Sequence, residues 1–200
     1  MADPIRFYLD FASPYAYFAA QQIDGIGQEF GREVEWRPIL MWAVLKAHGI
    51  AAPMDAPVKR AYMLNDMERS AAFFGMPYRK PVKLPLSSHL AGRLFYAVRE
   101  QDSDKAMALA RRLLPAFFAE QRDISDTTTL SELAAEVGIS PETVAEAMQG
   151  TVGRAGLEAA VAEAVTAGVV GSPHFLVDGE GFFGADRLPQ LRWFLGGGWT

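Results

Sequence analysis

The pattern of hydrophobic positions at the N-terminal end of the chain predicts a strand, a helix and a second strand. Residues 5–11 combine aromatic and β-branched side chains over a length typical of strands. Ser13 and Pro14 follow in the order of a helix N-cap and a first helical residue, which predicts a helix from about 14 to 30. Residues 34–39 again have strand character. Because strands joined by a helix of this length are usually parallel, the chain is expected to open with a parallel β-α-β unit.

Between residues 41 and 150 the pattern is that of helices alone. Helical segments are predicted over 41–47, 60–74, 90–100, 105–121, 129–138 and 141–150. Pro115 is expected to kink or interrupt its segment, because proline lacks the N–H of a helical hydrogen bond. Thr129 and Glu132 have the spacing of a capping box, which predicts a helix start at Thr129.

The C-terminal part returns to mixed structure. Helices are predicted over 156–167 and from 185 or 186 to 195, and a strand over 173–177. Asp178-Gly179-Glu180-Gly181 gives a strong hairpin-turn signal, after which Phe182 and Phe183 continue as the partner strand. The three glycines at 196–198 are interpreted as a tail after the last helix.

An all-helical block thus interrupts a β-α-β and a β-β-α arrangement. We predict an α/β fold in which residues 1–40 and 151–200 form the two halves of one domain. Residues 41–150 are predicted to form an inserted helical subdomain.

Composition narrows the classes of function. Half of the 200 residues are hydrophobic, so the chain can bury a sizeable core without disulfides or metals. The net charge of −5 and the absence of a basic run argue against nucleic acid and anionic membranes as partners. No apolar stretch reaches membrane-spanning length, and the N-terminus has no signal-peptide pattern, so we expect a cytoplasmic protein.

Cysteine is absent from the chain, which excludes a disulfide framework and any dithiol redox couple carried by the protein. The three histidines, His48, His89 and His174, lie in no metal-binding spacing. No metal site is therefore expected.

Three separated motifs resemble segments of one protein superfamily. Tyr8-Leu-Asp-Phe-Ala-Ser-Pro-Tyr15 resembles the reactive turn of DsbA-like thioredoxin proteins, although Ser13-Pro14-Tyr15-Ala16 stands where Cys-x-x-Cys is common. Gly171 to Gly179 resembles the superfamily strand that begins with a cis-proline, here Pro173. Phe183-Gly-Ala-Asp-Arg187 resembles the loop that binds the γ-glutamyl end of glutathione in kappa-class glutathione transferases and 2-hydroxychromene-2-carboxylate isomerases. The resemblance spans residues 5 to 195.

This resemblance implies a thioredoxin-like fold with an all-helical insertion, and a homodimer. It also implies that glutathione acts as a thiol cofactor in the cis–trans isomerisation of a small aromatic pyruvate-type acid. Ser13 would stabilise the glutathione thiolate at a helix N-terminus, where partial positive charge and free N–H groups favour an anion. The remaining residues implied to bind glutathione are Lys59, Ser172, Pro173, Asp186 and Arg187.

Two departures from the family pattern leave alternatives open. Ile50 stands where the family has an asparagine that contacts glutathione, and Ser87-Ser88 stands near a second such asparagine. A kappa-like glutathione transferase that keeps its thioether product is one alternative. A non-catalytic binding module with a thioredoxin fold is another, in which Ser13-Pro14 is a plain helix cap like Ser140-Pro141.

Aromatic side chains at helical spacing add a weaker prediction. They pack in the core more often than they line a site. Those considered for an aromatic-substrate pocket are Trp42, Phe73, Phe74, Phe117 and Phe118.

Overall fold

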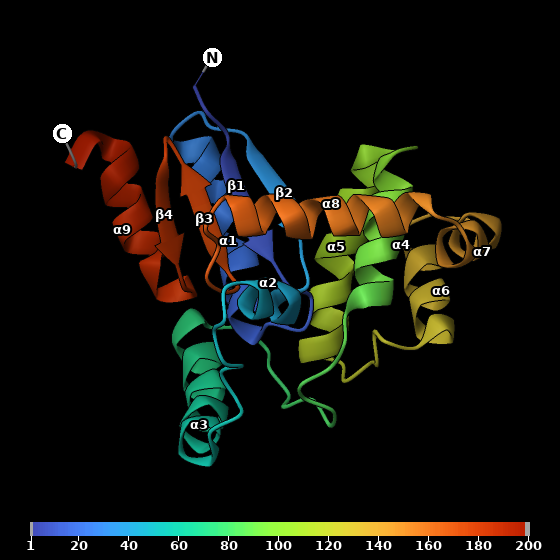
Figure 1. Cartoon of the computed structure of the whole chain (residues 1–200), viewed down its shortest axis with the longest axis horizontal. Coiled ribbons are helices and arrows are strands. Elements are labelled where there is room, and N and C mark those ends of the chain that lie inside the picture. Colours follow the sequence, from blue (N-terminus) through green and yellow to red (C-terminus); the bar gives the residue numbers. More distant parts are fainter. Residues whose placement is uncertain (1, 199–200) are drawn as a thin grey trace.

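The computed structural model describes residues 2–198, within which a mixed four-stranded sheet lies between layers of helices (Figure 1). The strands are β1 (Ile5–Leu9), β2 (Val34–Pro38), β3 (His174–Val177) and β4 (Glu180–Phe183), in the spatial order β2-β1-β3-β4. β1 runs parallel to β2 and antiparallel to β3, and β3 and β4 form an antiparallel hairpin. The predicted parallel opening and the predicted closing hairpin are therefore both confirmed.

The helices follow the predicted order. They are α1 (Pro14–Glu29), α2 (Met41–Ala47), α3 (Pro57–Phe74), α4 (His89–Arg99), α5 (Ser103–Phe118), α6 (Thr127–Glu136), α7 (Pro141–Gln149), α8 (Val152–Thr166) and α9 (Leu188–Trp193). Short helical turns, η1 (Ala185–Arg187) and η2 (Phe194–Gly198), flank α9. The interpretation of the glycines at 196–198 as a plain tail was wrong, because they complete the turn η2. No helix within residues 2–198 is both long and apolar enough to cross a membrane.

The prediction that Pro115 interrupts α5 needs correction. The helix continues past Pro115 and ends at Phe118, and the N–H of Ala119 donates to the Pro115 carbonyl. A proline near the end of a helix removes one hydrogen bond of the preceding turn and leaves its own carbonyl available. Its effect here is therefore confined to the last turn.

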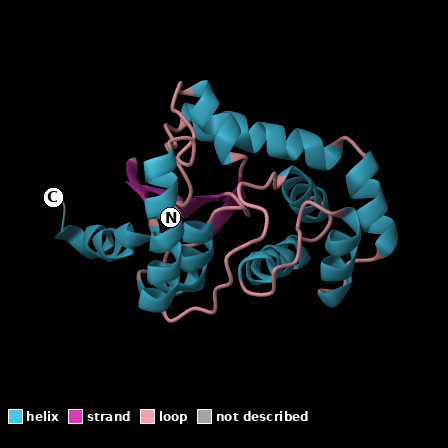
Figure 2. Ribbon diagram, turned by 90° about the horizontal axis from the view of Figure 1, so that it is seen from below, coloured by secondary structure: helices cyan, strands magenta, loops and turns pink. Residues whose placement is uncertain are grey.

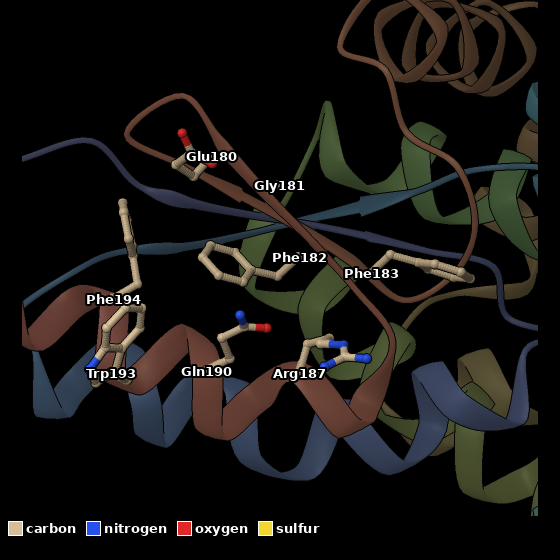
Figure 3. A pocket seen from close by; sticks show the side chains of 8 residues that line it. All are labelled: Glu180, Gly181, Phe182, Phe183, Arg187, Gln190, Trp193 and Phe194. Atoms are coloured by element: carbon tan, nitrogen blue, oxygen red, sulfur yellow. The ribbon is translucent and has the colours of Figure 1, made fainter. Parts of the chain in front are cut away.

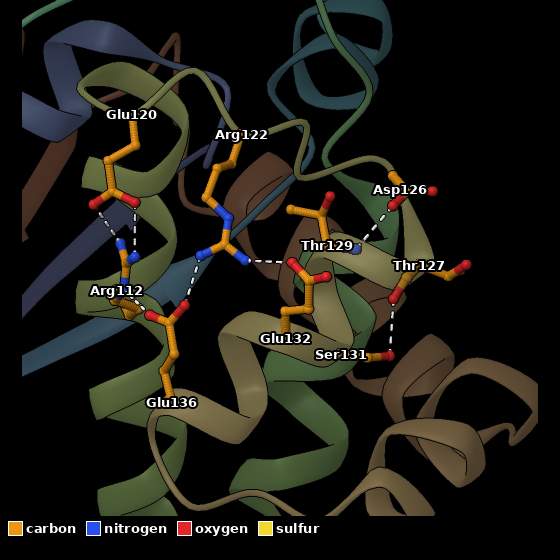
Figure 4. A network of polar contacts seen from close by, with 9 residues as sticks. All are labelled: Arg112, Glu120, Arg122, Asp126, Thr127, Thr129, Ser131, Glu132 and Glu136. Carbon is orange, nitrogen blue, oxygen red and sulfur yellow. Dashed lines mark hydrogen bonds and ion pairs between the residues drawn. The ribbon is translucent and has the colours of Figure 1, made fainter.

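The predicted capping box at Thr129 was also wrong. α6 begins at Thr127, and its N-cap is Asp126, whose carboxylate accepts the Thr129 N–H at 2.8 Å. Glu132 does not fold back on the helix start but pairs with Arg122 at 2.8 Å. Figure 4 shows this ion-pair network, in which Arg122 also meets Glu136 and so joins the end of α5 to α6.

α8 begins at Val152, four residues earlier than predicted, and contains two glycines close to its start. A Cβ on Gly153 would lie 2.1 Å from the Arg93 carbonyl oxygen, and one on Gly156 would lie 2.8 Å from the Tyr96 Cβ. These glycines let α8 approach α4 closely, so here they mark packing rather than a helix boundary.

The two faces of the sheet differ in chemistry, since side chains alternate along each strand. On the face of α1, the Phe7 ring lies 5.2 Å from both Trp36 and Phe175, between ring centroids. On the face of α8, Glu163 accepts hydrogen bonds from the Tyr8 hydroxyl and the Arg37 guanidinium, each at 2.8 Å. Figure 2 shows the strands with helices on both sides. Buried side chains of the sheet and of the helices between 41 and 150 form one contiguous core.

Candidate functional site

Ser13 stands at the turn between β1 and α1, where its side chain makes two kinds of contact. Its Oγ accepts the N–H of Ala16 at 3.3 Å, as an N-cap does, and its hydroxyl donates to the carbonyl oxygen of Ser172 at 2.8 Å. Ser13 is only 4% exposed. Ser140 caps α7 in the same local motif but is exposed and bonds only within its own first turn. The reactive-turn serine therefore does more than a plain cap.

The loop before β3 meets this turn. The Ser172–Pro173 peptide bond is cis, as the resemblance implied. The Ser172 Oγ accepts the Asp10 N–H at 2.7 Å, while the Ser172 carbonyl accepts the Ser13 hydroxyl. The Pro173 carbonyl in turn accepts the N–H of Gly184 at 3.0 Å. The turn, the cis-proline loop and the segment that carries Asp186 are thus joined by hydrogen bonds.

Backbone donors remain available at this junction. Within residues 2–198, the N–H groups of Tyr15 and Ser172 donate to no protein acceptor. Tyr15 is in the first turn of α1, where such groups also carry the positive end of the helix dipole. Two free N–H groups beside a hydroxyl fit a sulfur anion and a peptide carbonyl, which are the groups that glutathione would present.

A buried carboxylate, which the sequence motifs did not predict as a site residue, accepts hydrogen bonds from the turn and from two other segments. Asp10 is 5% exposed, and its Oδ1 accepts the Ala12 N–H at 2.9 Å and the Ser88 hydroxyl at 2.5 Å. Its Oδ2 accepts the Met41 N–H at 2.8 Å. Burial raises the pKa of the Asp10 carboxyl above its usual value, although these donors act against the rise. The sequence feature that could have indicated this role is the position of Asp10 between Leu9 and Phe11, inside an otherwise apolar segment.

The other predicted glutathione ligands lie at the surface. The side chains of Asp186 and Arg187, in η1, are 73% and 53% exposed and stand 3.6 Å apart. Lys59 is exposed in the first turn of α3, and no hydrogen bond within residues 2–198 joins it to Ser13 or Ser172. α3 is instead tied to α1 by the Tyr15 hydroxyl, which donates to Asp66 at 2.7 Å. Hydrogen bonds thus join Ser13 to the Ser172–Pro173 loop, and Lys59 takes no part in them.

The aromatic residues considered for a substrate pocket separate into two groups. Phe117 and Phe118 belong to the core, where Phe118 stacks on Tyr17 with 5.5 Å between ring centroids. Trp42 and Phe73 are exposed by 54% and 82%. The five therefore do not line one pocket, because consecutive residues on a helix point in different directions.

A cavity of about 460 Å³ lies between β4 and the C-terminal helix (Figure 3). It is lined by Glu180, Gly181, Phe182, Phe183, Arg187, Gln190, Trp193 and Phe194. Figure 3 shows Phe182 pointing from β4 toward α9, above Gln190. Neither Ser13 nor the cis-proline loop lines this cavity, so it adjoins the candidate site only through Arg187. Within residues 2–198, no cluster of three His, Asp or Glu side chains could hold a metal ion.

His174 follows the cis-proline and is buried with its Nδ1 unpaired. Burial lowers the pKa of its imidazole to about 4, from the ordinary value of 6.5. As pH falls, the unfolded chain gains a proton here before the folded chain does. The stability that the neutral imidazole provides is therefore complete above about pH 6.5 and is lost as pH falls toward 4.

We expect this residue to reduce the free energy of unfolding by up to about 3 kcal/mol between pH 7 and pH 4. Urea titrations at pH 7, 5.5 and 4 measure this loss. His174→Leu should remove that part of the loss, whereas His48→Leu, at an exposed position, should keep it. An equal pH dependence in the unsubstituted chain and in His174→Leu would contradict the assignment.

Comparisons with known proteins show the family and the fold of the chain. A family model described as a DSBA-like thioredoxin domain matches residues 4–196. The chain is 28% identical over 197 residues to 2-hydroxychromene-2-carboxylate isomerase of Sphingobium xenophagum, with 98% of this chain and 99% of that protein covered. It is 27% identical over 205 residues to glutathione S-transferase kappa 2 of Caenorhabditis elegans, with 96% and 91% covered.

A solved structure of a 2-hydroxychromene-2-carboxylate isomerase has a similar fold. The TM-score is 0.83 at 23% identity, and the superposition covers 96% of this chain and 94% of the other. The predicted thioredoxin-like fold with a helical insertion is therefore confirmed.

Proposed function

This chain belongs to the family of DSBA-like thioredoxin domains, and from that membership we propose that it is a glutathione-dependent cis–trans isomerase of a small aromatic pyruvate-type acid. The observation that carries the proposal is the buried Ser13–Ser172 hydrogen bond, with two free N–H groups beside it and no cysteine in the chain. The names of the relatives, an isomerase and a kappa-class glutathione transferase, support both the reaction class and the cofactor.

Each proposed ligand matches a different part of glutathione. The Ser13 hydroxyl, turned from the Ser172 carbonyl, and the Tyr15 N–H would donate to the sulfur, and the Ser172 N–H would donate to a peptide carbonyl. Asp186 would hold the α-ammonium group, and Arg187 in the same turn would meet the adjacent carboxylate. Lys59 would reach the glycyl carboxylate from α3.

When bound, glutathione supplies the thiol that opens a conjugated double bond and is regenerated when that bond re-forms. The chain would stabilise the sulfur anion through the donors of the turn and the positive end of the α1 dipole. The same effect lowers the pKa of protein cysteines at helix N-termini. The chain would also hold the cofactor backbone against the cis-proline loop.

A homodimer is part of the proposal, with α3 as the surface that supports it. α3 has 18 residues, of which only Met67 and Ala71 are buried, while Val58, Tyr62 and Phe73 are exposed by 85%, 61% and 82%. So much exposed apolar area on one helix is typical of a subunit contact. A sedimentation mass of one chain at micromolar concentration would contradict the homodimer.

A reduced thiol cofactor also favours the cytoplasm as the place where the protein acts.

The test of the proposed function uses the purified, unsubstituted chain. We expect saturable binding of reduced glutathione in calorimetric titration, and glutathione-dependent change in the absorbance of 2-hydroxychromene-2-carboxylate. Oxidised glutathione is the control, because it has no free thiol. A stable thioether product would favour the transferase alternative. Absence of both binding and turnover at millimolar glutathione would contradict the proposal and favour a non-catalytic binding module.

A further inference from the structure

Three segments that are distant in sequence meet at the Asp10 carboxylate. Its oxygens accept from Ala12 in the reactive turn, from Met41 at the start of α2, and from Ser88 just before α4. Ala12 and Ser88 share one oxygen, Oδ1, so the residues next to Ser88 lie close to the reactive turn. Asp10 also accepts the Ser13 N–H at its backbone carbonyl, at 2.9 Å, so these three segments are held to the residue that supports the Ser13 turn.

Exposed side chains with distinct chemistry flank two of these contacts. Trp42 follows Met41 and is 54% exposed. Ser87 and His89 lie on either side of Ser88 and are both exposed, while Ser88 itself is buried. The Ser87 Oγ lies 3.1 Å from the Nδ1 of His89, within hydrogen-bond distance. An exposed indole and an exposed imidazole thus lie next in sequence to residues that contact Asp10.

In the Ser87–His89 contact either partner can be the donor, and in both cases the Nε2 of His89 lies outside the contact. A protonated imidazole carries hydrogens on both nitrogens. With Nδ1–H donating to the Ser87 Oγ, the Nε2–H remains available to a substrate. Imidazole is the side chain that most often transfers protons in enzymes that work near neutral pH.

We propose that His89, oriented by Ser87, is the proton-transfer group for the aromatic keto acid, which stacks on Trp42 beside Ser13. This inference rests on the proposed function and adds to it a catalytic residue and the place of the substrate. Stacking of a flat acid on an exposed indole is favoured by the large area that an aromatic ring buries.

The proton balance is closed over the cycle. When the conjugated double bond opens, the keto oxygen gains electron density and takes the proton from His89 Nε2, giving an enol and a neutral imidazole. Rotation then occurs about a carbon–carbon single bond. When the double bond re-forms, the enol O–H bond breaks and the proton returns to Nε2. The sulfur anion would form a carbon–sulfur bond when the double bond opens and would leave with that electron pair when the double bond re-forms, so no reagent is consumed.

The kinetic test uses His89→Gln, which stays polar but cannot transfer a proton. We expect kcat to fall by about 100-fold, with the affinity for glutathione changed by less than twofold. Ser87→Ala should lower kcat several-fold, because it removes the hydrogen bond that orients the His89 imidazole but keeps the imidazole itself. His48→Gln, a matched change at another exposed histidine, should leave kcat unchanged.

A binding experiment without glutathione tests whether His89 contacts the keto acid. The chain has three histidines, so their ring signals can be followed by NMR during titration with benzylidenepyruvate, a conjugated aromatic keto acid. The His89 ring signals, assigned by their loss in His89→Gln, should shift saturably, and those of His48 should not. Trp42→Ala should lower the affinity for benzylidenepyruvate several-fold.

The outcomes separate this inference from the proposed function. Glutathione-dependent turnover that survives His89→Gln, or a His89 ring that does not respond to the keto acid, would overturn the inference alone. Absence of glutathione binding and turnover in the unsubstituted chain would overturn the proposed function and this inference with it.

Discussion

Replacing Ser13 with alanine is expected to lower kcat/KM for the glutathione-dependent reaction by 10- to 100-fold, roughly the value of one hydrogen bond to a charged group. The hydroxyl donates to the Ser172 carbonyl at 2.8 Å, and because it has one hydrogen it would turn from that carbonyl to donate to the sulfur anion. Its removal leaves the anion with the N–H groups of the turn and the helix dipole. Initial-rate kinetics over a range of glutathione concentrations measure the effect, together with calorimetric titration.

Ser140→Ala is the matched control for this prediction. Ser140 also precedes a proline and caps a helix by accepting the N–H of Thr143. Loss of the cap should cost about 1 kcal/mol in each variant, and Ser13→Ala should cost more in urea, because it also leaves the buried Ser172 carbonyl without its donor. Only Ser13→Ala should lose activity. Equal activity in the two variants would mean that Ser13 acts as a plain cap and would contradict its role as thiolate donor.

Features that depend on neighbouring residues could be predicted from the sequence. The cap at Ser13 and the hairpin turn at Asp178-Gly179 are examples, because a side chain within three residues, or a turn that needs positive φ, decides each one. Asp178 and Gly179 indeed have φ values of 50° and 84°. Local chemistry was sufficient there.

Features that depend on distant contacts could not be predicted in this way. The helix predicted from residue 156 begins at Val152, and Gly153 and Gly156 inside it admit α4. Thr129 and Glu132 fit a capping box, but Arg122 attracts Glu132 and Asp126 provides a better cap. In both regions a partner from another element outweighed the local pattern.

The candidate site shows the same division. The sequence motifs pointed to Ser13 and Pro173, but the support beneath them joins residues that are 31 and 78 positions apart, from Asp10 to Met41 and from Asp10 to Ser88. No spacing rule reaches that far. The proposed roles of Trp42 and His89 rest on those contacts, which no local pattern contains.

Replacing Asp10 with alanine is expected to reduce the free energy of unfolding by about 3 kcal/mol at pH 7, the largest effect on stability of the changes considered. The carboxylate accepts from Ala12, Met41 and Ser88, and its loss leaves these donors without their partner in a buried place, at about 1–3 kcal/mol each. Part of this cost is offset, because burial already disfavours the charged carboxylate and raises its pKa. The net effect is therefore smaller than the sum.

Two further variants separate the contributions to this effect in urea unfolding at pH 7. Ser88→Ala removes one donor and leaves the other two satisfied, so it should cost about 1 kcal/mol. Asp10→Asn keeps an acceptor for Ala12 and Ser88 but turns an amide N–H₂ toward the Met41 N–H, so its cost should lie between the other two. A loss below about 1 kcal/mol in Asp10→Ala would mean that the three segments are held by packing rather than by the carboxylate. Because the carboxylate contacts both Ala12 in the reactive turn and Ser88, between Ser87 and His89, Asp10→Asn should also lower kcat more than it lowers glutathione affinity.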